Sequence, residues 1–163
     1  MKFRCVNEMS QLGFDDAGIL SFKYEDGILE FTFQGALVKA KNSQNARYQD
    51  MVCGEIILQL KNARIMRIVK EGMKYYDANG ELQREIPDED IPAPAQSSVL
   101  RRIAGGTVFT TVEDDVKEGY AIEFGIDVPQ EEEEDEVDTF WLCVTFDESV
   151  ACWDRYCSPA EQG

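Results

Sequence analysis

The sequence has no histidine among its 163 residues. This absence excludes Ser-His-Asp and Cys-His nucleophile systems, HExxH metal sites and a histidine general base. Glycine-rich phosphate-binding motifs of the GxxxxGKS and GxGxxG types are also absent. An enzyme made from this chain would depend on carboxylates, tyrosines, lysines or a thiol. The sequence therefore predicts no catalytic residue, no cofactor and no enzymatic activity.

Paired cysteine motifs are absent as well. The five cysteines are an odd number, none forms a CxxC pair, and their spacing fits no common zinc site. The N-terminus has no apolar signal-peptide core, and no apolar stretch is long enough to span a membrane. These features predict a cytoplasmic protein with reduced thiols, no bound metal and no membrane contact.

Positive charge is scarce. The chain has 16 basic and 32 acidic residues, which gives a formal net charge of −16. Such a balance argues against binding to nucleic acid or to an anionic membrane surface. A basic protein partner would complement this negative charge, although the charge can also serve only to keep the protein soluble.

Strand-like alternation is the main feature that the sequence does contain. Residues 19–33 predict a hairpin, because Asp26-Gly27 suits a type I′ turn. In the expected register Phe22 faces Phe31 and Leu20 faces Phe33. Residues 1–18 are expected to be irregular.

A second hairpin is expected at residues 73–86. A type I′ turn at Asn79-Gly80 would set Met73 opposite Ile86 and Asp77 opposite Leu82. Prolines mark 87–94 as a linker or edge segment.

The stretch that begins at Ser97 predicts the one helix. It would be capped by Ser97 or Ser98 and followed by Gly105. Arg101 and Arg102 are expected to project into solvent from its last turn.

The last apolar stretch, 137–156, predicts a C-terminal hairpin. One face carries Phe140, Leu142, Val144 and Phe146. The opposite face carries Thr139, Trp141, Cys143 and Thr145, so it is half polar, which indicates an additional cover or a ligand groove. Residues 157–163 are expected to form a short tail.

The most charged segment directly precedes this stretch. It is predicted to form a solvated loop over 130–137, between two strands. The same loop is the main candidate for a partner-binding site, with one aromatic anchor nearby. The candidate binding residues are Glu131, Glu132, Glu133, Glu134, Asp135, Glu136 and Trp141.

Together these patterns predict a mainly β fold. We expect a single acidic domain over 1–163, built as an antiparallel meander with one short helix. The meander could close as a barrel or fold as a sandwich, and the sequence does not choose between the two. The oligomeric state is left open.

One short motif resembles a known group of proteins. Phe14-Asp15-Asp16-Ala17-Gly18-Ile19 resembles the F-x-D-A-x-I opening of small bacterial β proteins, and 152–156 is similar to their C-terminal strands. Some members of that group are immunity proteins of toxin systems. The resemblance implies a small bacterial cytoplasmic protein and says nothing about catalysis.

Three functions remain open. The first is a non-catalytic protein-binding module, for example an immunity or inhibitor protein for a basic partner. The second is a carrier of a small apolar ligand inside a β-barrel. Its lining would come from Phe22, Phe31, Phe33, Phe124, Phe140 and Phe146. The third is a hydrolase that uses carboxylates such as Asp147 and Asp154.

Overall fold

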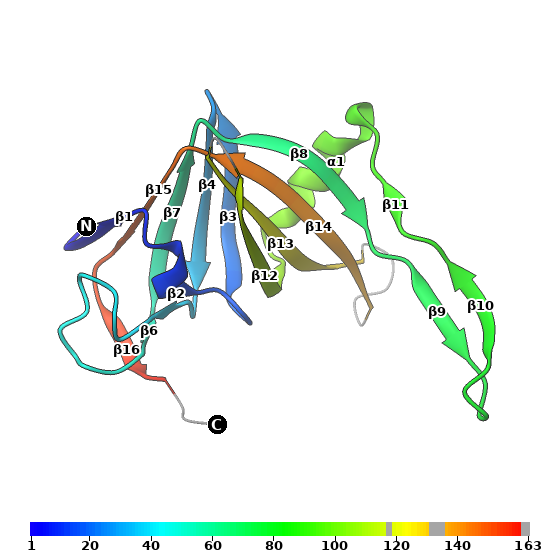
Figure 1. The fold of residues 1–163 in the computed structure, drawn as a ribbon, viewed down its shortest axis with the longest axis horizontal. Coiled ribbons are helices and arrows are strands. Elements are labelled where there is room, and N and C mark those ends of the chain that lie inside the picture. Colours follow the sequence, from blue (N-terminus) through cyan, green and yellow to red (C-terminus); the bar gives the residue numbers. More distant parts are fainter. Residues whose placement is uncertain (117–118, 131–135, 161–163) are drawn as a thin grey trace.

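The computed structural model describes residues 1–116, 119–130 and 136–160 (Figure 1). It confirms a mainly β fold with one α-helix, and all of its strand pairs are antiparallel. The largest sheet has ten strands. In spatial order these are β1 (Phe3–Val6), β15 (Glu148–Trp153), β7 (Glu55–Lys61), β4 (Ile28–Gln34), β3 (Gly18–Glu25), β12 (Thr107–Val116), β13 (Gly119–Pro129), β14 (Val137–Phe146), β8 (Arg64–Lys70) and β11 (Glu89–Asp90).

This sheet is not closed as a barrel, because its two edges are β1 and β11. It is folded over on itself instead. Phe31 on β4 and Phe124 on β13 lie 4.8 Å apart between ring centroids, although β3 and β12 separate their strands within the sheet. Two half-sheets therefore face each other across one core, which is the sandwich alternative.

A sharp corner links the two half-sheets. The pair Lys61↔Glu148 between β7 and β15 and the pair Arg64↔Thr145 between β8 and β14 lie on either side of it. At the corner the Asp147 N–H donates to the Lys61 carbonyl (2.9 Å). The Asn62 amide donates to the Asp147 carboxylate (2.8 Å). The chain thus crosses from one half to the other twice at the same place.

The corner overturns the predicted C-terminal hairpin. β14 pairs with β13 and β8, whereas β15 pairs with β7 and β1. The apolar alternation predicted for β14 is confirmed, but it does not reveal which strands are neighbours. The predicted tail is also wrong in part, since β16 (Tyr156–Pro159) pairs with β6 (Met51–Cys53).

The first hairpin, β3 with β4, confirms most of the predicted register. Asp26 and Gly27 both have positive φ, as a type I′ turn requires, and Phe22 pairs with Phe31. A bulge between Ile19 and Ser21 changes the far end, where Ile19 rather than Leu20 pairs with Phe33. The bulge turns Leu20 outward and buries Ile19.

The N-terminal residues are not irregular, contrary to expectation. They form β1, a 3-10 turn η1 (Met9–Gln11) and β2 (Leu12–Gly13). A second sheet holds β16, β6, β5 (Leu37–Val38) and β2 in that order. Phe14 and Ala17 are buried because the N-terminal segment folds over one end of the core. Long-range pairing of this kind leaves little local signal in a sequence.

The single helix, α1 (Ala93–Ile103), packs against β3 and β13. It begins earlier than predicted, at Ala93, and its N-cap is Pro92 rather than a serine. A proline in the first helical turn is compatible because that turn needs no N–H donor. Gly105 follows the helix with φ of 92°, as expected, and Val99 and Ile103 face the core.

Candidate functional site

The hairpin β9 (Met73–Tyr76) and β10 (Leu82–Ile86) forms a two-stranded sheet of its own. We call it the arm. Figure 1 shows it projecting from one end of the molecule, away from the folded sheet. Every residue of both strands is exposed. An isolated two-stranded hairpin is only marginally stable in water, so an uncovered arm is an unusual feature.

The arm continues the β8–β11 pair outward. Glu89 pairs with Lys70 at its base, and Ile86 pairs with Met73 beyond a short break. At the break the Gly72 N–H donates to the Asp88 carboxylate (2.7 Å). A Cβ atom at Gly72 would lie 1.9 Å from the Ile86 carbonyl oxygen, so only glycine fits where the two chains approach. The arm is therefore attached through a specific backbone arrangement.

The tip of the arm corrects the predicted turn. Only Gly80 of the Asn79-Gly80 pair has positive φ. The Gly80 N–H donates to the Asp77 carbonyl (3.1 Å), which gives a type I turn followed by a glycine bulge. Tyr76 rather than Asp77 therefore pairs with Leu82, while the predicted pair of Met73 and Ile86 is confirmed.

Exposed apolar side chains are concentrated on the arm. The described part of the chain exposes fifteen large apolar side chains, and five of them lie within residues 73–86. These five are Met73 (56% exposed), Tyr75 (41%), Tyr76 (59%), Leu82 (49%) and Ile86 (40%). Exposed apolar clusters on an otherwise polar protein mark interaction sites.

The surroundings of the arm are acidic. Residues 71–90 contain seven carboxylates and two cations. Lys74 pairs with Glu85 across the arm (4.0 Å), and the Arg84 guanidinium lies 5.5 Å from the Tyr75 ring centroid. Both cations of the segment are thus engaged within the arm, and most of its carboxylates face solvent.

The base of the arm adjoins the acidic end of β13 and β14. The Glu71 N–H donates to the Thr139 carbonyl (2.8 Å). Asp138 binds Lys70 of β8 (3.7 Å) and Arg102 of α1 (2.9 Å), and it accepts a hydrogen bond from the Gln130 amide (3.1 Å). One carboxylate therefore ties the helix, the base of the arm and the base of the acidic loop together.

Arg102 departs from the sequence-based expectation. Its side chain is 24% exposed, donates to the Pro129 carbonyl (3.2 Å) and lies 5.5 Å from the Phe140 ring centroid. It is a structural link rather than a solvent-facing charge. Arg101 is exposed as predicted.

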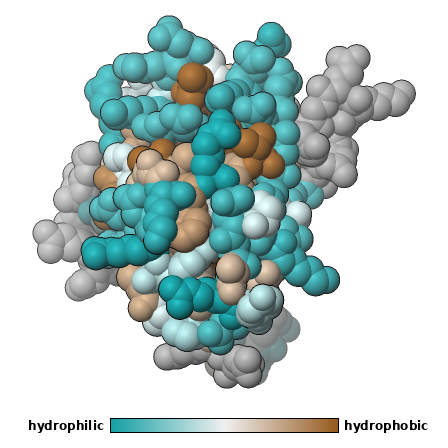
Figure 2. Space-filling model, turned by 90° about the vertical axis from the view of Figure 1, so that its left-hand side faces the viewer, coloured by the Kyte–Doolittle hydropathy of each residue, from teal (hydrophilic) through white to brown (hydrophobic). Residues whose placement is uncertain are grey.

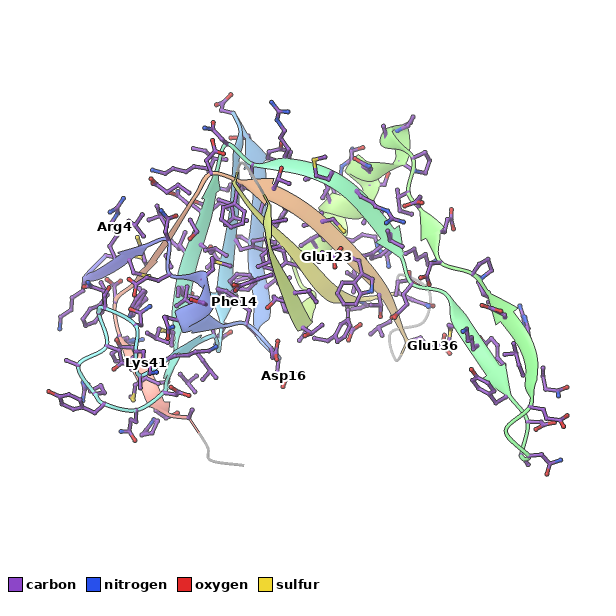
Figure 3. All side chains as sticks on the ribbon, in the orientation of Figure 1. Arg4, Phe14, Asp16, Lys41, Glu123 and Glu136 are labelled. Atoms are coloured by element: carbon purple, nitrogen blue, oxygen red, sulfur yellow. The ribbon has the colours of Figure 1, made fainter. Side chains whose placement is uncertain are left out.

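The predicted binding residues are only partly described. Glu131, Glu132, Glu133, Glu134 and Asp135 lie outside the described residues. Glu136 is exposed, and its carbonyl accepts from the Gln130 N–H (3.0 Å), so residues 130–136 connect two paired strands as expected. Glu136 lies at the end of the sheet nearest the arm (Figure 3).

Trp141 lies further along β14 on the outer face of the sheet. Five residues of extended chain separate it from Glu136, about 17 Å. Its indole is half-buried and meets the Phe109 ring edge-on, with 5.3 Å between centroids. Phe109 covers Gly125, where a Cβ atom would lie 2.4 Å from the Phe109 Cε1 atom. The predicted cover of the half-polar face is thus Phe109, beside a bulge in β12.

The phenylalanines proposed for a ligand chamber form the core instead. The Phe31 ring centroid lies 4.8 Å from that of Phe33, on which it stacks, and 5.0 Å from that of Phe22. Phe124 and Phe140 are buried in the same core. These rings fill the space between the half-sheets. A shallow cavity of about 450 Å³ lies elsewhere, on the surface between β2, β5 and β12.

The two aspartates considered for hydrolysis are not brought together. Asp147 lies at the corner before β15 and Asp154 follows the same strand, about 20 Å further along an extended chain. Asp154 accepts from the Lys2 N–H (2.9 Å), and Asp147 accepts from Asn62 (2.8 Å). Each carboxylate has a structural partner.

The free thiols are shielded to different degrees. Burial raises the pKa of Cys53 to about 12, with Cys157 close by. Burial and a hydrogen bond to Glu123 (3.4 Å) raise the pKa of Cys143 to about 11. Cys157 is exposed. Among the described residues, no group of three or more His, Cys, Asp and Glu side chains is placed to hold a metal ion.

These thiols give a direct test of the fold. Iodoacetamide at pH 8 is expected to modify Cys157 first and Cys53 last, because a thiol with a pKa of about 12 is almost entirely protonated at that pH. Peptide mapping of timed samples would measure the order, and the denatured chain should react at all five cysteines. Equal rates at Cys53 and Cys157 in the folded protein would contradict the burial of Cys53.

Comparison with known proteins returned no relatives. No family model matches the chain, and no match was found among curated proteins or solved structures. No helix in the described part of the chain is long and apolar enough to cross a membrane.

Proposed function

We propose that this protein is a non-catalytic binding module that engages a basic protein partner through the arm. The observation that carries the proposal is the exposure of all five large apolar side chains on an uncovered hairpin. Rigid aromatic and aliphatic side chains of this kind are typical anchors of protein interfaces.

The charge of the arm indicates the chemistry of the partner. Seven carboxylates and two cations lie within residues 71–90, in a chain whose net charge is −16. A basic surface that carries apolar pockets would satisfy both the anchors and the carboxylates. An immunity or inhibitor protein for a basic toxin is one example of such a module.

The test uses a displayed library of random peptides of about twelve residues, selected against the immobilised protein. We expect the enriched peptides to combine lysine or arginine with apolar residues. Their affinity should fall at least about tenfold in a variant with Tyr75→Ser, Tyr76→Ser and Leu82→Ser.

A matched control removes three exposed apolar side chains outside the arm. The variant with Leu20→Ser, Ile28→Ser and Met66→Ser should bind the same peptides within about twofold of the wild type. Enriched peptides that are acidic, or that bind the arm variant as tightly as the wild type, would overturn the proposal.

A further inference from the structure

The end of the molecule opposite the arm has a different charge. It is formed by residues 1–8, by the loop 39–50 and by residues 154–157, which meet around a cluster of aromatic rings. Tyr156 lies 5.6 Å from Phe3 between ring centroids, and the Arg47 guanidinium lies 6.0 Å from the Tyr156 ring. Asn42 of the loop lies 3.6 Å from the Cys5 sulfur of β1. We call this region the basic end.

Six exposed cations lie on the basic end: Lys2, Arg4, Lys39, Lys41, Arg47 and Arg155. Arg4 and Lys41 both lie on the left side of Figure 3, far from Glu136 and the arm. None of the six forms an ion pair within residues 1–116, 119–130 and 136–160. In a chain with twice as many acids as bases, this local excess is a marked asymmetry.

The carboxylates of the same segments are turned toward backbone donors. Glu8 accepts from the Ser43 N–H (2.8 Å), Asp50 from the Ala40 N–H (2.8 Å) and Asp154 from the Lys2 N–H (2.9 Å). These hydrogen bonds hold the acids in place, whereas the cations are not paired with carboxylates. Lys39 donates to the Ser10 carbonyl (3.1 Å), and Lys2 and Arg47 lie over the Phe3 and Tyr156 rings. Figure 2 views the molecule from this end, and the surface that it shows is mainly hydrophilic.

The loop 39–50 is held in one shape by buried amides. The Asn45 amide donates to the carbonyls of Val38 (3.1 Å), Lys39 (3.1 Å) and Gln49 (2.9 Å), and Asn45 is only 9% exposed. The Asn45 side-chain oxygen also accepts from the Arg47 N–H (2.9 Å). A loop with this many internal bonds loses little freedom when it binds.

Tyr48 in this loop has an unfavourable backbone conformation. Its φ is 63°, and its side chain is 93% exposed. A bulky residue at positive φ is rare, because its Cβ crowds the backbone, and such strain often accompanies a functional position. The strained backbone thus holds an aromatic ring in solvent, in a loop that also carries Lys41 and Arg47.

We propose that the basic end binds an acidic segment of a partner protein, with Tyr48 as its aromatic anchor. The cations attract the carboxylates, and the ring contacts an apolar residue among them. Solvent screening over about 8 Å at physiological salt lets this local excess act despite the net charge of the chain. A nucleic acid is less suited, because the patch is small and acidic surface surrounds it. The protein would then carry two docking sites, one at each end.

The test measures fluorescence anisotropy with a fluorescein-labelled peptide of glutamates around two central leucines. We expect Lys41→Glu with Arg47→Glu to weaken binding of this peptide by at least about tenfold. The matched control is Lys74→Glu with Arg84→Glu on the arm, which changes the net charge equally and should alter affinity by less than about twofold. Equal losses in both variants, or no binding to the wild type, would overturn the proposal.

Two further measurements separate the anchor from charge alone. Tyr48→Gly should weaken binding of the acidic peptide severalfold. The same substitution should raise the melting temperature of the protein by about 2–4 °C, because glycine adopts positive φ without strain. Tyr48→Phe should keep the affinity. An unchanged affinity in Tyr48→Gly would contradict the anchor, and tighter binding of a labelled oligothymidylate would assign the site to nucleic acid instead. The peptides selected through the arm should bind the Tyr48 variants and the Lys41/Arg47 variant as tightly as the wild type, so the two proposals fail separately.

Discussion

Replacing Phe31 with alanine is expected to lower the free energy of unfolding by about 3–5 kcal/mol, the range for a fully buried phenylalanine. Phe31 has no exposed surface, and its ring contacts Phe33 and Phe22 in its own half-sheet and Phe124 in the other. The substitution leaves a cavity where the two half-sheets meet, so both halves lose packing. Urea denaturation followed by circular dichroism would measure the loss.

The control for this variant is Tyr75→Ala on the arm. Tyr75 is 41% exposed and lies outside the core, so its removal should change the stability by no more than about 0.5 kcal/mol. A loss below about 1 kcal/mol in Phe31→Ala would mean that the half-sheets do not pack through this ring.

Replacing Asp138 with alanine is expected to lower the free energy of unfolding by about 2–3 kcal/mol. The Asp138 side chain is 15% exposed, and it pairs with Arg102 (2.9 Å) and Lys70 (3.7 Å). Its loss leaves the half-buried guanidinium of Arg102 without its carboxylate, and the Arg102 Nε atom already has no hydrogen-bond partner. The helix and the base of the arm should loosen together, which hydrogen exchange at α1 and β8 would detect.

Asp138→Asn and Glu148→Ala are the comparisons for this variant. The Asp138→Asn variant keeps a hydrogen-bond acceptor for Arg102, so it should lose less stability than Asp138→Ala. Glu148 pairs with Lys61 at the surface, where both side chains are 41% exposed, so Glu148→Ala should cost about 0.5 kcal/mol or less. If Asp138→Ala were as mild as Glu148→Ala, Asp138 would not be the link between helix and sheet.

The elements predicted most accurately are those with strong local signals. Asp26-Gly27 specifies a tight turn, and the alternation after it places Phe31 and Phe33 on one face. The strand over Val137–Phe146 follows in the same way from period-two alternation, with Phe140 and Leu142 inside. These features depend on neighbours along the chain, so the sequence contains them directly.

The candidate site was predicted less well. The apolar residues of the arm are visible in the sequence, but nothing local indicates that they stay exposed. The missed signal was composition: residues 71–90 combine tyrosines with seven carboxylates and a glycine at the base. Tyr48 was missed because a positive φ at tyrosine has no mark in the sequence.

The sequence by itself determined the class of the fold, the position of its tight turns and the absence of histidine chemistry. Only the tertiary structure decided that 137–156 is no hairpin, because the corner at Asp147 sends β14 and β15 to opposite half-sheets. It also decided which apolar residues are uncovered and that cations gather opposite the arm. The physical reason is the same in each case: strand partners and surface neighbours are set by contacts between residues distant in the chain, and each strand alone has the same alternation with any partner.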